Sequence, residues 1–211
     1  MPAPEVDIRR VAEAHVRLRM AVEVLTDEEV KRPSALPGWT VGHLLTHIAR
    51  NADSHVRRTE AATRGEYVEQ YEGGLEGRAA AIEDGAARSS TELIADVIGS
   101  AAKLDACWAG VPTHAWTVWS KDSSGTERRL LELPSRRWQE VEVHIVDLGT
   151  GATHRDWPDD FVASWLPRTH EKMLAHLPAA SASWPDDPRD ELAWLYGRLE
   201  RDDLPVLPAW G

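Results

Sequence analysis

The pair of residues most capable of chemistry in this sequence is Glu140 and His144, which lie four residues apart in the segment 136–149. At 100° per residue this segment is predicted to be a helix of about four turns. Its apolar stripe consists of Trp138, Val141, Ile145 and Leu148. Residues at i and i+4 share a helix face, so the carboxylate and the imidazole project together beside that stripe. They form half of a metal site if another helix supplies the rest, and otherwise a solvated pair on a wet face.

A third ligand can come from a second predicted helix, 41–63, which carries three histidines. Thr40 is its expected N-cap, after a break at Pro37-Gly38. On the helical wheel His47 and His55 lie nearer the apolar stripe than His43 does. His47 lies at the flank of the stripe, as Glu140 and His144 do on their own helix. Any one of these histidines is also explained as a partly buried ring that is hydrogen-bonded to a neighbour.

The rest of the chain supplies further helices that must position these side chains. Periodic apolar residues predict helices at 5–25 and at 90–109, a shorter one near 78–87, and the helix 136–149 with Ser135 as its N-cap and Gly149 after its end. Loop-like sequence is expected at 66–77, and two short extended pieces at 116–119 and 129–133. These elements indicate an all-α four-helix bundle over residues 1–150.

Residues 151–211 differ in sequence pattern from the bundle and are expected to form a short, mostly helical C-terminal extension that packs on it. The predicted elements are a helix that ends near residue 176, a linker at 177–188, and a helix at 190–200 followed by a Pro-broken tail. We therefore predict two units, 1–150 and 151–211.

Composition excludes several classes of protein. The net charge is −11, from 24 basic and 35 acidic residues, which argues against binding to nucleic acid or to an anionic membrane. An anionic substrate would need a local arginine instead. Cys107 is the only cysteine, so a metal must be held by histidines and carboxylates, and a reducing cytoplasm suits the chain. No apolar run is long enough for a membrane span, and the N-terminus lacks a signal peptide.

Two stretches resemble the signatures of a known family. They are LPGWTVGHLLTHIARN at 36–51 and RWQEVEVHIVDLG at 137–149. Both are similar to the mycothiol-dependent maleylpyruvate isomerase family, which belongs to the DinB-like superfamily of four-helix bundles, and the resemblance covers most of residues 5–150. It implies a divalent metal, expected to be zinc, bound by His47, Glu140 and His144.

The same resemblance gives roles to other residues. It implies mycothiol, a low-molecular-weight thiol, as the cofactor, and Arg198 as an arginine needed for catalysis and for binding. His43 and Glu142 are decoys, because each points away from the face that carries the proposed ligands. Asp147, three residues after His144, is either a group that supports the metal ligand or a solvated carboxylate near the helix end.

A His₂Glu site leaves a coordination position open, which is typical of catalytic zinc, although such a ligand set also suits other divalent metals. Three functions remain open from the sequence. The first is a cis-trans isomerase that activates the thiol as a zinc thiolate. The second is a mycothiol S-transferase that joins the thiol to an electrophile, and the third is a metal-binding bundle without turnover. The expected partners are a small-molecule substrate and the thiol, in a monomer or homodimer.

Overall fold

The computed structural model describes residues 3–173 and 184–207. The chain divides into two compact units, Met1–Thr150 and Gly151–Gly211. Each is described by itself below. Within the described ranges, no helix has both the length and the apolar composition that a membrane crossing requires.

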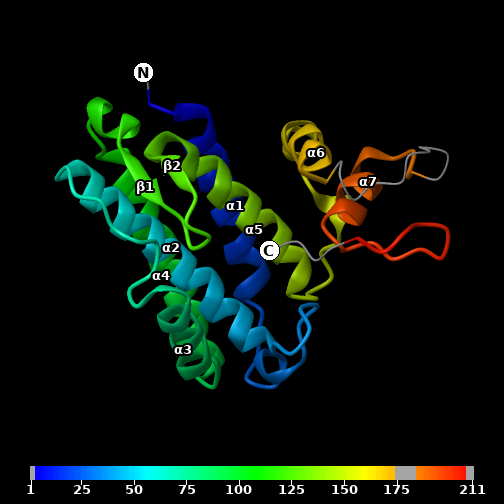
Figure 1. Ribbon diagram of the computed structural model, residues 1–211. Helices are drawn as coiled ribbons and strands as arrows, with labels where there is room; N and C mark the ends of the chain where they lie inside the picture. The colour runs from blue at the N-terminus through cyan, green and yellow to red at the C-terminus, as the bar shows by residue number, and fades with distance from the viewer. Residues whose placement is uncertain (1–2, 174–183, 208–211) are drawn as a thin grey trace. The chain divides into compact units, whose positions relative to one another are not determined.

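The first unit is a helical bundle, as the sequence predicts (Figure 1). Its helices are α1 (Glu5–Val22), α2 (Val41–Thr63), α3 (Gly74–Ala86), α4 (Ser90–Ala109) and α5 (Leu133–Asp147). Helix α2 packs against α3, α4 and α5, whereas α1 packs against α4 and α5. The apolar stripes meet in a core that includes the buried side chains of Leu18, Leu44, Ile48, Leu104 and Val141. Burial of these stripes is the main stabilising contribution to the fold.

Local sequence sets most helix ends. Thr40 caps α2 by accepting a hydrogen bond from the backbone N–H of His43, and Ser89 caps α4 in the same way through Glu92. The prediction for α5 is wrong at its start, because Ser135 is not the N-cap. The helix begins three residues earlier than predicted, at Leu133, with Pro134 in its first turn. Proline suits that position because the first-turn N–H has no partner within the helix, and the Ser135 hydroxyl donates to the Glu132 carbonyl instead.

The segments between the helices differ more from the sequence prediction. Helix α3 begins at Gly74, inside the predicted loop. The strands are β1 (Trp119–Lys121) and β2 (Glu127–Arg129), an antiparallel pair. They lie closer to the turn than predicted because Asp122 fixes it, accepting from the backbone N–H groups of Ser124 and Thr126. Most of the predicted extended residues instead belong to two 3₁₀ turns, η2 (Thr113–Thr117) and η3 (Leu130–Glu132). Another short turn, η1 (Glu29–Lys31), precedes α2.

The second unit contains η4 (His154–Asp156), α6 (Asp159–Met173) and α7 (Pro188–Leu195). Its small core joins Met173, Trp194, Leu195 and Leu204. The predicted helix 190–200 ends early, because Gly197 has a φ of 70° and turns the chain. The predicted end of α6 near residue 176 and most of the predicted linker lie outside the described residues.

Candidate metal centre

The structure brings together the three side chains that the sequence singles out. His47 comes from α2, and Glu140 and His144 come from α5. Each offers a ligand atom, and the three atoms lie within 4.8 Å of one another. His47 Nε2 is 2.7 Å from Glu140 Oε1 and 3.2 Å from His144 Nε2. This is one compact cluster of two imidazole nitrogens and a carboxylate oxygen, the donor types that Zn²⁺ prefers when cysteine is absent.

Two packed helices position the cluster. Successive turns of α5 place Glu140 and His144 on one face, and α2 presents His47 across the seam where the two helices pack. Both imidazoles are buried, and the Glu140 carboxylate is partly exposed. The site therefore lies at the edge of the apolar core with one side accessible, which suits a metal that keeps an open position.

The charges of the three groups depend on one another. Burial lowers the pKa of His47 to about 4 despite its hydrogen bond to Glu140, so this ring is neutral at pH 7. Burial also opposes ionisation of Glu140, but hydrogen bonds from His144 and His47 outweigh it and hold the Glu140 pKa well below its usual range. The cluster thus offers an ionised carboxylate and a neutral imidazole, the protonation states that metal ligation requires.

Asp147 supports His144 from behind. Its side chain is fully buried, and Oδ2 lies 2.8 Å from His144 Nδ1. Burial lowers the pKa of His144, but the hydrogen bonds to Asp147 and Glu140 outweigh it and raise the pKa overall. A carboxylate on Nδ1 fixes the ring and directs Nε2 toward the cluster. Of the two interpretations of Asp147, the solvated carboxylate is therefore wrong.

Arg78 is a neighbour of the centre that sequence reasoning missed. Its Nη2 donates to His47 Nδ1 at 3.1 Å, and its guanidinium lies over the rings of Trp39 and Tyr71, 5.8 Å and 5.7 Å from their centroids. Because a guanidinium only donates, the neutral His47 ring carries its proton on Nε2, facing Glu140. A metal bound at Nε2 would take the place of that proton. No spacing signal could find Arg78, since it comes from α3, a separate helix whose start the sequence misplaces.

The decoy residues lie elsewhere. His43 Nδ1 is 2.7 Å from the Thr40 hydroxyl in the α2 cap, and Nε2 is 3.3 Å from Glu83. Glu142 is buried and accepts from Arg17 and from the Trp138 indole. Neither residue belongs to the ligand cluster, in agreement with the wheel argument.

The remaining candidates have other surroundings. His55 is buried further along α2, 3.2 Å from Arg58 Nη2 and packed on Trp108. Cys107 is half-buried, and burial raises the pKa of its thiol, so it is not an activated nucleophile. Arg198 belongs to the second unit, where its Nη1 donates to the Tyr196 carbonyl at 2.5 Å. Its role at the metal centre stays a prediction.

Known structures resemble the chain closely. A crystal structure of a mycothiol-dependent maleylpyruvate isomerase is 23% identical with a TM-score of 0.87, and the match covers 100% of this chain and 98% of that one. A histidine-to-alanine mutant of an enzyme of that name matches at 21% identity with the same TM-score and coverage. At these identities the likeness shows the fold. The match includes the C-terminal region.

Comparison of sequences gives the family. No curated protein matches the chain significantly. The family model described as the mycothiol maleylpyruvate isomerase N-terminal domain matches residues 11–149, about two thirds of the chain, including both signature stretches. The chain therefore belongs to the mycothiol maleylpyruvate isomerase N-terminal domain family.

Proposed function

We propose that this protein is a metal-dependent and mycothiol-dependent cis-trans isomerase of the maleylpyruvate type. The observation that carries the proposal is the cluster of His47, Glu140 and His144, buried on one side and accessible on the other, in a chain of this family. The similar solved structures support it, because their fold extends over the whole chain.

Each residue at the centre has a proposed role. His47, Glu140 and His144 hold the metal, expected to be zinc, and Asp147 keeps His144 in the orientation that ligation needs. A zinc ion in such a site supplies Lewis acidity, which lowers the pKa of a bound thiol so that it is ionised at neutral pH. The aromatic rings of Trp39 and Tyr71 pack around Arg78, which donates to His47 Nδ1 and fixes the orientation of that ring.

The reaction follows from the chemistry of a thiol and a conjugated cis-enoyl diacid. Reversible addition of sulfur to the double bond makes it single, so the carbon chain can rotate before elimination restores the double bond in the trans form. The protein must hold the carboxylates of the substrate while this bond rotates. Arg198 is proposed to do so, because a guanidinium pairs with a carboxylate through two parallel hydrogen bonds.

The test is an assay of the purified full chain loaded with Zn²⁺, with mycothiol and maleylpyruvate. Free thiol and the cis and trans products are measured over time. An isomerase converts many equivalents of substrate while free thiol stays constant. We expect His144→Ala to abolish this conversion together with most of the bound metal, and His43→Ala to keep both.

Two other outcomes correspond to the alternative functions. Consumption of one thiol for each electrophile, without isomerisation, would show an S-transferase. Metal bound at one equivalent with no turnover of either kind would show a metal-binding bundle. Either result would replace the isomerase proposal.

A further inference from the structure

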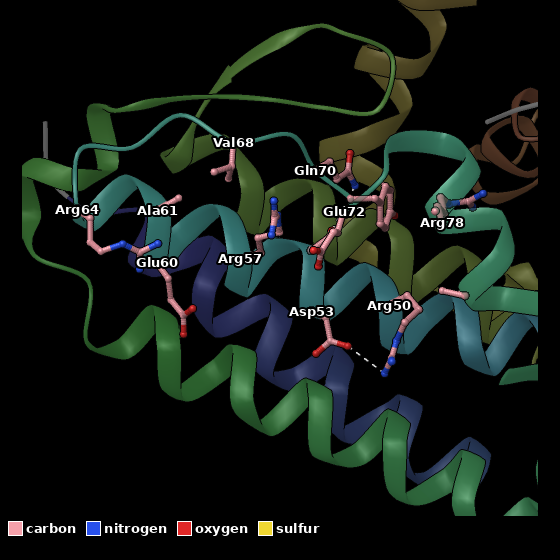
Figure 2. Close-up of a pocket in the computed structure, with 14 residues that line it drawn as sticks. Arg50, Asp53, Arg57, Glu60, Ala61, Arg64, Val68, Gln70, Glu72 and Arg78 are labelled. Carbon is pink, nitrogen blue, oxygen red and sulfur yellow. Dashed lines mark hydrogen bonds and ion pairs between the residues drawn. The ribbon is translucent and has the colours of Figure 1, made fainter. Parts of the chain in front are cut away.

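A cavity of about 460 Å³ lies along α2, on the side covered by the segment that leads into α3. Figure 2 shows Arg50, Asp53, Arg57 and Glu60 in a row on α2, with Arg64 directly after the helix end and with Gln70, Glu72 and Arg78 across from them. From residue 50 to residue 64 there are 14 steps along the chain, about 21 Å at a helical rise of 1.5 Å per residue. The cavity is therefore elongated, and its volume lies in the range that takes a drug-sized ligand.

One end of this cavity lies beside the metal centre, on the far side of His47 from the cluster, and none of the three candidate ligands lines it. Arg78 lines the cavity and also donates to His47 Nδ1. Tyr71 lines it as well, with the Arg78 guanidinium over its ring. A ligand whose reactive atom is at the metal would have to pass Arg78 to place its body in this cavity.

The charged residues of the lining fall into two groups. Arg50 is neutralised by Asp53 and Asp96, at 2.9 Å and 2.6 Å, and Arg64 is paired with Glu66 at 2.8 Å. Within the described ranges, Arg57 and Arg78 have no carboxylate at ion-pair distance, and Glu60 and Glu72 have no cation at that distance. The wall thus presents two guanidinium donors and two carboxylate acceptors that no ion pair occupies.

Such a mixed wall selects the chemistry of its ligand. A dianion would pair with the arginines but meet the charges of Glu60 and Glu72. A molecule with many hydroxyl groups satisfies both sets, because each hydroxyl donates to a carboxylate and accepts from a guanidinium. A short diacid would also leave most of 460 Å³ to water.

We propose that this cavity binds the polyhydroxylated body of the thiol cofactor, with Arg57 and Glu72 as hydrogen-bonding partners of its hydroxyl groups. The inference rests on the proposed function for the identity of the ligand, since mycothiol joins its cysteine to an amino sugar and a cyclitol. The thiol end lies at the metal, and the sugar and cyclitol lie along α2 beyond Arg78. The substrate diacid then approaches the centre from outside this cavity.

The test uses the metal-free full chain and S-methyl mycothiol, whose blocked sulfur does not need the metal. Binding is measured by isothermal titration calorimetry. We expect Arg57→Gln and Glu72→Gln each to weaken binding about tenfold, the loss typical of a hydrogen bond to a charged group. Both residues are exposed, so the fold should be kept. Arg64→Gln is the matched control. Its affinity for S-methyl mycothiol should stay within about twofold of wild type, because Arg64 already forms an ion pair with Glu66.

Comparison ligands make the result decisive. S-methyl-N-acetylcysteine lacks the sugar and cyclitol, and its binding should not depend on Arg57. The proposal is overturned if S-methyl mycothiol fails to bind the wild-type protein, if it binds Arg57→Gln as tightly, or if fumarate is the ligand whose binding Arg57→Gln impairs. These outcomes are measured without turnover, so they are independent of whether the metal-loaded protein isomerises maleylpyruvate.

Discussion

Replacing Asp147 with asparagine should weaken metal binding without removing a ligand. The substitution keeps the size of the side chain but removes the charge that faces His144 Nδ1 at 2.8 Å. Loss of a carboxylate behind a ligating histidine costs about 10- to 100-fold in metal affinity, or about 1.4–2.7 kcal/mol. We expect a value within this range, since Asp147 is fully buried and water cannot take over its role.

The assay is competition for Zn²⁺ against a chromophoric chelator at pH 7.5, with metal-free protein. Glu142→Gln is the matched control on the same helix, because it also neutralises a buried carboxylate but one that contacts Arg17 and Trp138. It should reduce the free energy of unfolding and leave zinc affinity within about twofold of wild type. Equal zinc affinities in the two variants would refute the supporting role of Asp147.

Three further predictions concern other parts of the chain. Burial, and after it the charge of Arg58, lowers the pKa of His55 well below 6.5. As the pH falls from 7.5 to 5.5, His55 is therefore protonated in the unfolded state but not in the folded state, which destabilises the fold. In urea unfolding of the metal-free protein, His55→Gln should make the loss of stability over this pH range smaller by about 1.4 kcal/mol. Gly42→Ala should lower the melting temperature, measured by circular dichroism, despite the better helix propensity of alanine, because a Cβ there would lie 2.3 Å from the Ala86 carbonyl oxygen of α3; an unchanged melting temperature would contradict this close contact. Arg198→Lys should lower kcat/KM for maleylpyruvate about tenfold or more with unchanged metal content, and unaltered kinetics would remove Arg198 from the proposed site.

Sequence periodicity predicts which residues share a helix face, and that part of the site is accessible from sequence. Glu140 and His144 follow from their i,i+4 spacing, and the positions of His43 and Glu142 away from the seam follow from the wheel. Which helix faces α5 does not follow from periodicity, because packing partners are set by the whole fold. The wheel makes His47 a candidate third ligand, and its pairing with Glu140 and His144 comes from the family resemblance.

Other features depend on contacts that sequence patterns do not carry. Asp147 is the last residue of α5, and the last residues of helices are usually exposed to solvent. Only the tertiary structure shows that Asp147 is fully buried. Arg78 approaches His47 from another helix, and the start of that helix at Gly74 was hidden in glycine-rich sequence. The start of α5 was misplaced because Pro134 can occupy the first turn of a helix as well as end the segment before it.

The placement of His47 and His144, 97 residues apart in the sequence, gives a bound metal a topological role. A permanent cross-link that closes a loop of this length raises the free energy of the unfolded chain by about 4.7 kcal/mol, because it lowers the conformational entropy of that state in the chain-entropy treatment of disulfides. A metal ion is an exchangeable link, so its contribution grows with the logarithm of free metal and reaches about 2.7 kcal/mol at 100 times the dissociation constant. The apolar contacts between α1, α2, α4 and α5 do not include the ligands. A metal bound at this site would therefore stabilise the bundle to an extent set by the free metal concentration.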